Sequence, residues 1–234
     1  ALLRRHDPVA ADAAGFERVL RALADRLLPA LGADAWPPDV RISTDPALPD
    51  VPWELLPWRG GRLGEHVHVI RVASPGLGRA AGPASAPRGR GTFVLAVGDP
   101  DLPGVAREVR AIAAAAGGAV SRVGAGATKA SVVAAFSRAR VVHLAGHGWD
   151  ASDAPPLGGV RVADGWVTAA DLPSSGLRAE LVVLAACRTG RTSGRAHEAW
   201  GGLVPALLGA GVRRVVWTTD DVEDDSTSAL MSRF

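Results

Sequence analysis

Two uninterrupted apolar runs mark the centre of the chain, at residues 141–145 and 181–186. Neither run alternates between apolar and polar positions, which is typical of strands buried on both faces of a parallel sheet. Each run is followed by a reactive residue and a turn, His147 before Gly148 and Cys187 before Arg-Thr-Gly. Ligands bind at the carboxyl ends of strands in open α/β sheets. If the two strands are neighbours, His147 and Cys187 face each other across one crevice.

The pattern around these runs predicts repeated β-α units over residues 91–234. Short apolar runs alternate with segments of helical spacing, each closed by Gly or opened by a capping residue. A small hairpin is expected at 159–167, turning at Asp164-Gly165. The further elements expected are strands at 93–97 and 213–218 and helices at 105–116, 129–139, 198–208 and from near Ser226. This pattern predicts an α/β core with a mainly parallel sheet flanked by helices.

The first 75 residues read differently. An amphipathic helix is predicted over residues 12–31, where apolar side chains recur at helical spacing before Gly32. Short strands are expected at 40–44 and at 66–72, the second because His and aliphatic residues alternate there. Residues 76–90 are rich in Gly, Pro, Ala, Ser and Arg and predict a flexible connection. We therefore expect a smaller N-terminal helix-and-hairpin subdomain at 1–75, the connection, and a core at 91–234 that continues beyond residue 234 in a longer protein.

Composition narrows the function classes. The 234 residues are 47% apolar with 28 Gly and 17 Pro, which suits a globular protein with many turns. The net charge is only +2 and no basic run is interleaved with aromatics, so direct nucleic-acid binding is not expected. No apolar run approaches the roughly 20 residues that span a bilayer. The single cysteine excludes an internal disulfide and a Cys-based zinc site, and a free thiol suits the cytoplasm.

The chemistry of the two reactive residues is that of a Cys–His hydrolase. A thiolate is a strong nucleophile, and a neighbouring imidazole takes its proton and later protonates the leaving amine. Gly148 has no side chain, so its backbone N–H is open to a substrate, and the amide of Cys187 is the natural second donor to an oxyanion. No third residue that orients the dyad is identifiable from the sequence. A lone Cys in a strand is more often a core residue, but its place at a strand end favours catalysis here.

Other polar residues receive structural interpretations. His143, inside its strand, is expected to be a buried histidine with a satisfied hydrogen bond, and Asp171 to belong to a capping box that opens at Thr168. His66 and His68 lack a third metal ligand nearby. Residues 124–131 lack the order of a phosphate-binding loop, and Thr128 is better explained as a helix N-cap. The sequence therefore predicts neither a cofactor nor a metal.

Two motifs carry a family resemblance. His-Leu-Ala-Gly-His-Gly at 143–148 and Leu-Ala-Ala-Cys-Arg-Thr-Gly at 184–190 resemble the CHAT domain of caspase-like (clan CD) cysteine peptidases, with further matches at 52–57, 97–100, 163–165, 209–212 and 222–225. The resemblance implies a caspase-like fold and a cytoplasmic cysteine endopeptidase in bacterial signalling or defence. It also implies a protein or peptide substrate and regulation by a helical-repeat sensor domain or partner, with 188–197 as the mobile loop.

An acidic segment departs from the family pattern. Many CHAT sequences resemble Leu-Trp-Pro-Val-Asp-Asp near 217–222, whereas this chain has acids at 220 and 221. In the related separases, acidic residues of the corresponding segment face the side chain before the scissile bond. The resemblance thus implies that Asp220, Asp221 or Asp224 favours Arg or Lys there. The alternative is that Asp224 or Asp225 caps the helix that begins near Ser226.

Two other functions stay open at this point. A catalytically silent CHAT-like module could keep the fold and signal through binding alone. Acyl or glycosyl transfer by the same dyad is a weaker third reading. The intact His-Gly and Cys-Arg-Thr-Gly elements favour the peptidase, and the reactivity of the thiol would separate it from a silent module.

Overall fold

A computed structural model describes residues 13–30, 36–43, 51–72, 91–96, 102–117, 119–149, 158–187, 189, 202–218 and 221–233. The chain divides into two compact units, Ala1–Ala80 and Ala81–Phe234. The predicted connection at 76–90 lies outside the described residues, as does the loop at 188–197 apart from Thr189.

The second unit is built on a five-stranded sheet. Its strands are β5 (Thr92–Ala96), β6 (Val120–Val123), β7 (Val141–Ala145), β11 (Leu181–Ala185) and β12 (Arg214–Trp217). They are ordered β12-β11-β7-β5-β6, and every pair is parallel. The runs that precede His147 and Cys187 are therefore direct neighbours, which is the condition that the sequence analysis left open. The carboxyl ends of β7 and β11 meet at one edge of the sheet.

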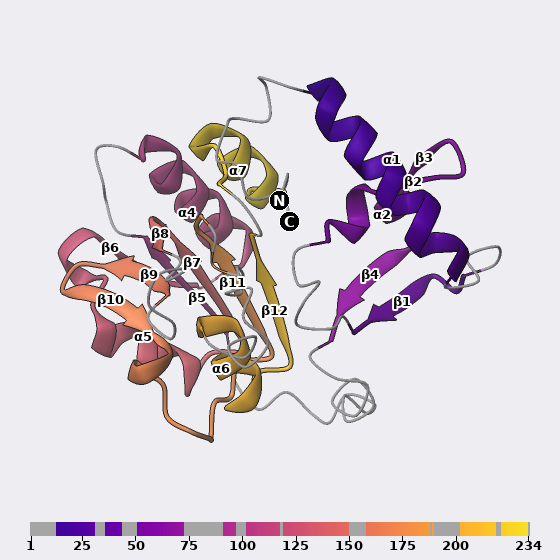
Figure 1. The fold of residues 1–234 in the computed structure, drawn as a ribbon. Helices are drawn as coiled ribbons and strands as arrows, with labels where there is room; N and C mark the ends of the chain where they lie inside the picture. The colour runs from indigo at the N-terminus through magenta and orange to yellow at the C-terminus, as the bar shows by residue number, and fades with distance from the viewer. Residues whose placement is uncertain are drawn as a thin grey trace. The chain divides into compact units, whose positions relative to one another are not determined.

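Helices cover both faces of this sheet (Figure 1). Helices α4 (Pro103–Ala115) and α7 (Asp224–Met231) lie on one face, and α5 (Lys129–Phe136) and α6 (Leu203–Gly209) lie on the other. Successive residues of a strand pack against the helices on opposite faces of the sheet, because side chains on a strand point alternately to the two faces. Ala145, Val183 and Ala185 pack against Val105 and Val109 of α4. The other core is larger and contains Val142, Leu144, Val182, Leu184, Phe136 and Leu207.

A three-stranded antiparallel sheet follows the His strand. It consists of β8 (Gly148–Trp149), β9 (Gly159–Val162) and β10 (Gly165–Thr168) in the order β10-β9-β8. The predicted hairpin at 159–167 is confirmed, but it turns at Ala163-Asp164, one residue before the predicted turn, because Gly165 already pairs with Val162. Val160, Val162 and Val167 are buried in the larger core. This hairpin therefore anchors β8, and with it the chain that leaves His147.

Asp171 has the structural role that the sequence predicted. It lies in the short helix η5 (Ala169–Asp171), and its carboxylate accepts hydrogen bonds from the backbone N–H and the hydroxyl of Thr168, each at 2.9 Å. The Lys129 ammonium lies 3.0 Å away. Burial raises the pKa of Asp171, but the hydrogen bonds from Thr168 and Lys129 and the charge of Lys129 together hold it below its usual value.

Helix termini agree with the sequence in one case and differ in another. Thr128 caps α5, accepting a hydrogen bond from the Ser131 amide, and the short helix η4 (Gly124–Gly126) precedes it. The helix predicted at 198–208 begins at Leu203 instead. Gly202 precedes it with a φ of 108°, a left-handed conformation that a helix interior excludes. Residues 198–201 lie outside the described residues.

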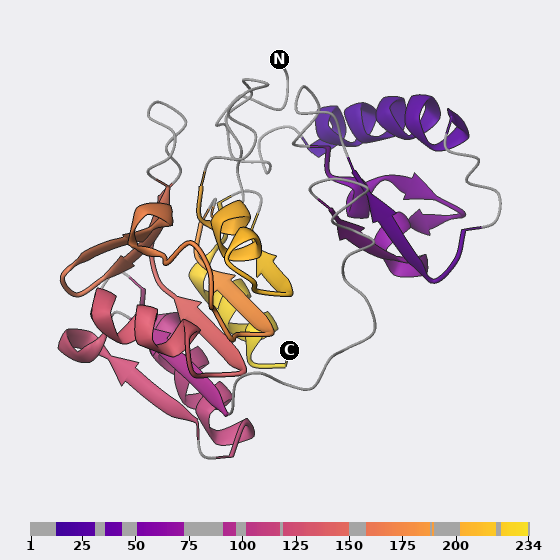
Figure 2. The same cartoon turned by 90° about the horizontal axis from the view of Figure 1, so that it is seen from below.

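The first unit has its own apolar core. Its elements are α1 (Ala13–Ala30), β1 (Asp39–Ile42), η3 (Trp53–Leu55), β2 (Pro57–Trp58), β3 (Gly61–Arg62), α2 (Leu63–His66) and β4 (His68–Arg71). Leu20, Ala24 and Leu28 of α1 pack in one core with Leu56 and Leu63, and α1 lies across this unit's strands (Figure 2).

The strands of the first unit pair differently from a simple hairpin. A small hairpin, β2–β3, turns at Arg59 and Gly60, which both have positive φ. Strands β1 and β4 pair in parallel. The strand predicted from residue 66 begins at His68, because residues 63–66 form α2, whose first residue, Leu63, is fully buried.

Candidate active site

The ends of β7 and β11 bring His147 and Cys187 to one cavity. Ala145 stands opposite Ala185 in the parallel ladder, so residues 147 and 187 follow at the same level. Both side chains line a small cavity of about 30 Å³, together with Gly146, Ala185 and Ala186. The structure therefore brings together the two residues for which the sequence predicted chemistry.

Gly148 lies directly against the Cys187 peptide. A Cβ atom at position 148 would stand 2.0 Å from the Cys187 carbonyl oxygen and 2.9 Å from its nitrogen, so only glycine allows this approach. Gly148 is also opposite Val160 in the β8–β9 ladder, where the Arg161 N–H donates to the His147 carbonyl at 2.9 Å. This makes Gly148 a non-hydrogen-bonded pair with Val160. Its N–H is therefore directed away from β9.

Two threonine hydroxyls hold the turn before Cys187. The Oγ1 atoms of Thr189 and Thr218 both donate to the carbonyl oxygen of Ala186, at 3.3 Å and 2.5 Å. Thr218 comes from the end of β12, 32 residues away in the sequence. No sequence pattern singles out Thr218, since only the pairing of β12 with β11 brings its hydroxyl here.

Residues at the start of α7 form the outer wall of the cavity. Val222, Asp224 and Thr227 line it, opposite Leu102 and Val105 of the α4 region. The Cys187 thiol donates a hydrogen bond to the Val222 carbonyl, with 3.7 Å between sulfur and oxygen. The nucleophile candidate is thus held by main chain that lies 35 residues further on. As described, the cavity has room for about one or two water molecules.

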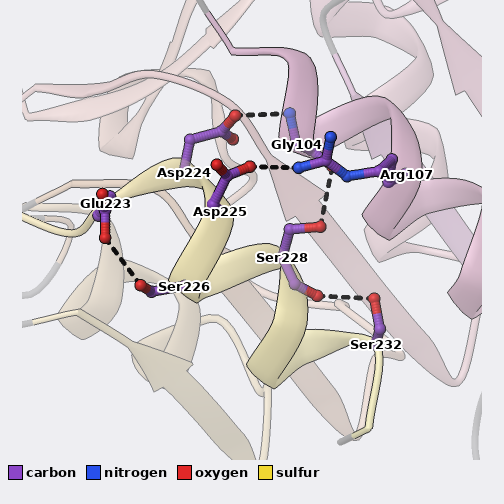
Figure 3. Close-up of polar contacts among 8 residues, drawn as sticks. All are labelled: Gly104, Arg107, Glu223, Asp224, Asp225, Ser226, Ser228 and Ser232. Carbon is purple, nitrogen blue, oxygen red and sulfur yellow. Dashed lines mark hydrogen bonds and ion pairs between the residues drawn. The ribbon is translucent and has the colours of Figure 1, made fainter.

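Polar contacts fasten α7 to α4, as Figure 3 shows. The Gly104 N–H donates to the Asp224 carboxylate at 2.5 Å, and the Ser228 hydroxyl donates to the Gly104 carbonyl at 3.0 Å. Arg107 and Asp225 form an exposed ion pair beside them. Asp224 therefore satisfies an amide in the first turn of α4, where the helix dipole favours an anion.

These contacts place the acidic residues for which the sequence left two interpretations. Asp224 lines the cavity, whereas Asp221 is exposed and is not among the lining residues. Asp220 lies outside the described residues. The expectation that Asp224 or Asp225 caps the following helix is wrong, because both lie in its first turn and Glu223 occupies the N-cap position. The Glu223 carboxylate accepts a hydrogen bond from the Ser226 hydroxyl at 2.8 Å. Asp224 instead binds the neighbouring helix α4.

A buried carboxylate–imidazole pair lies beside the cavity. The Glu108 carboxylate of α4 is 2.5 Å from His143 Nε2 of β7, and the two side chains are 2% and 4% exposed. The prediction that His143 is a satisfied buried histidine is confirmed. Glu108 also lines the cavity with His147 and Cys187, and sequence reasoning missed it. The available signal was a charged residue on the apolar face that Val105, Val109 and Ile112 define.

The two described histidines of the first unit, His66 and His68, have ordinary surroundings. His68 Nδ1 is 3.0 Å from Asp39, and the His66 ring packs edge-on to Trp58 with 5.2 Å between ring centroids. Within the described ranges, no three His, Cys, Asp or Glu side chains gather as a metal site. No helix in that part of the chain has the length and apolarity needed to span a bilayer.

A parallel α/β sheet that presents Cys and His at adjoining strand ends defines a class that includes the Cys–His hydrolases. A family model for the CHAT domain matches residues 17–234. The chain therefore belongs to the CHAT domain family, which is related to the caspase-like (clan CD) cysteine peptidases. A search of curated proteins found no match.

Proposed function

We propose that this protein is a cysteine endopeptidase that cleaves protein substrates, with Cys187 as nucleophile and His147 as general base and acid. The observation that carries the proposal is the shared cavity. Two side chains 40 positions apart, both of the type needed for thiol catalysis, meet at the ends of adjacent parallel strands. Membership of a peptidase-related family supports the same assignment.

The proposed reaction proceeds through an acyl-enzyme. His147 takes the Cys187 proton, and the sulfur attacks the substrate carbonyl carbon to form a tetrahedral intermediate. The intermediate collapses as His147 donates the proton to the leaving amine, which breaks the peptide bond. Water, deprotonated by His147, then attacks the thioester and releases the carboxylate product and the free thiol.

The amides of Gly148 and Cys187 are the proposed oxyanion donors. Two observations support this: Gly148 lies against the Cys187 peptide, and its N–H is directed away from β9. Two converging N–H groups stabilise the developing negative charge more than the ground-state carbonyl. Because Gly148 has no side chain, its backbone can lie this close to the Cys187 peptide.

Substrate preference and regulation belong to the same proposal. Asp220, Asp221 and Asp224 are proposed to favour a basic residue before the scissile bond, and the position of Asp224 in the cavity wall supports its part. The narrow cavity and the thiol bond to Val222 support a closed resting state that a sensor domain or partner opens. We propose that it acts in the cytoplasm.

The same closed cavity favours a second candidate, a catalytically silent interaction module. A thiol that is permanently bonded to Val222 and shielded from substrate would serve only to hold the fold. The two candidates differ in the reactivity of Cys187, because a catalytic thiolate reacts with alkylating reagents far faster than a buried structural thiol.

The deciding experiment measures cleavage of a peptide library varied before the scissile bond. The protein is compared with Cys187→Ala, His147→Ala and, as a matched control for loss of a histidine, His68→Ala, since His68 is exposed and belongs to the other unit. The proposal expects cleavage by the wild type and His68→Ala only. Cleavage that persists in Cys187→Ala would overturn it. A wild type that neither cleaves nor reacts with iodoacetamide identifies the silent module.

A further inference from the structure

The buried carboxylate of Glu108 has no part in the reaction described above. Glu108 is 1% exposed and lies on α4 between Val105 and Val109, on the face that packs against the sheet. Burying a charged group is costly, so a charge kept in such a place often serves a function. His143 holds the carboxylate by a hydrogen bond, and Glu108 also forms part of the wall of the cavity.

The cavity around Cys187 is acidic as well as apolar. Among the described residues, its lining includes two carboxylates, Glu108 and Asp224, and the other titratable groups there are His147 and Cys187. None of the described residues that line it is Lys or Arg. The other walls are aliphatic, formed by Leu102, Val105, Ala185 and Val222 among others. Apolar walls with a carboxylate suit a side chain that has an aliphatic stem and a cationic head.

The two carboxylates are not equivalent. Asp224 binds a main-chain N–H in the first turn of α4, and the positive end of that helix offsets its charge. Glu108 lies more than one turn further along α4, and its partner is an imidazole. Both side chains of the Glu108–His143 pair are buried, and in surroundings of low dielectric a carboxylate acts strongly on a nearby charge.

We propose that Glu108, held in place by His143, is the specificity-determining residue that makes the Cys187 cavity select cationic groups. This inference rests on the proposed peptidase function, and it assigns the preference for a basic residue chiefly to Glu108 instead of the acidic residues that follow β12. A long side chain enters as the outer wall moves outward. The start of that wall is held to α4 by polar contacts, one of them the exposed Arg107–Asp225 pair, whereas Met231 at the other end of α7 is buried in the core that α4 and the sheet share.

Small charged thiol reagents test the inference without requiring peptidase activity. Cys187 is the only cysteine, so each label adds at one site, where the thiolate displaces methanesulfinate and forms a mixed disulfide. The rates with a cationic aminoethyl and an anionic sulfonatoethyl methanethiosulfonate are compared and normalised to those of 2-mercaptoethanol. A charge several Å from the sulfur changes this ratio on the order of tenfold.

The wild type is expected to favour the cationic reagent by about tenfold. Glu108→Gln keeps the shape and hydrogen bonding of the side chain and should bring the ratio close to that of the free thiol, while Glu108→Asp keeps the preference. The matched control is Glu223→Gln, which removes an exposed carboxylate that neighbours the wall without lining the cavity. Equal rates in the wild type, or an unchanged ratio in folded Glu108→Gln, would overturn the inference.

Matched peptides separate this inference from the proposed function. With Arg or Leu before the scissile bond, Glu108→Gln should lower the Arg/Leu ratio of kcat/KM by about tenfold. A merely structural role would lower both equally, which counts against the inference. If no peptide is cleaved while labelling favours the cation, the peptidase proposal fails and the anionic cavity stands. If Glu108→Gln does not fold, the wild-type labelling ratio alone decides.

Discussion

The contact between Gly148 and the Cys187 peptide provides a sharp test of the geometry of the site. Replacing Gly148 by Ala would place a Cβ atom 2.0 Å from the Cys187 carbonyl oxygen. The Cys187 carbonyl is main chain, so no flexible side chain can swing aside to make room for the added Cβ atom. The clash is relieved only if β8 and the turn that carries Cys187 move apart.

The size of the effect follows from this distance. Carbon and oxygen atoms need about 3 Å or more, so the two segments must separate by about 1 Å. A 1 Å misplacement of reacting groups costs about 100-fold in rate, and overpacking a well-packed site costs about 1–3 kcal/mol of unfolding free energy. Gly148→Ala should therefore lower kcat/KM about 100-fold or more, and lower Tm by a few degrees.

Gly209→Ala is the matched control. Gly209 ends α6, is exposed, and an added Cβ atom there meets nothing within 4 Å. Alanine is the better helix former, so this variant should keep its activity and equal or exceed the wild type in Tm. Both variants are compared by urea denaturation and by cleavage of the best library peptide. Gly148→Ala with activity within threefold of wild type would refute the proposed packing of Gly148 on Cys187.

Three further predictions concern stability. Asp171→Asn should lower Tm at pH 7, because the folded-state pKa of Asp171 lies below its unfolded value of about 3.9 in spite of partial burial. The difference in Tm between the variant and the wild type should shrink toward zero below about pH 4, and a difference in thermal scans that does not change with pH would contradict this. Asp224→Ala should lower the free energy of unfolding in urea by about 1–2 kcal/mol, because it removes the hydrogen bond to the first turn of α4. Asp225→Ala, at an exposed ion pair, should lower it by less than about 1 kcal/mol, and the reverse order would be evidence against the α4–α7 contacts. Phe136→Ala, at a fully buried position, should cost about 3–5 kcal/mol by the same assay, whereas Leu230→Ala, at 63% exposure, should be close to neutral.

Local patterns in the sequence were sufficient for β7 and β11 and for the two central residues, but not for the edge strand β6, whose residues are all exposed. The runs before His147 and Cys187 are apolar apart from His143, because both faces of β7 and β11 are covered by helices and consecutive residues are therefore buried. The capping roles of Thr128 and Asp171 were predictable for the same reason, since each acts within three residues. The start of α6 was not, because Gly202 takes a left-handed conformation that composition alone does not reveal.

The surroundings of the site depended on contacts between distant segments. Glu108, Thr218 and Val222 reach it across separations of 32 to 35 residues from His143, Ala186 and Cys187, respectively. Asp224 shows the difference most clearly. Its sequence position beside a helix start predicted a cap for that helix, whereas packing of α7 on α4 offered its carboxylate the amide of Gly104, 120 residues earlier.

By itself, the sequence determined that this chain forms a parallel α/β core with a histidine and a cysteine at the ends of two buried strands. Those features follow from short-range periodicity and from motifs of adjacent residues, which survive in a linear string. The tertiary structure decided which polar groups surround the nucleophile, how narrow its cavity is, and that Glu108 and Asp224 face it. These depend on which helix packs against which face of the sheet, and that choice is made by the summed burial of the core and not by any local pattern.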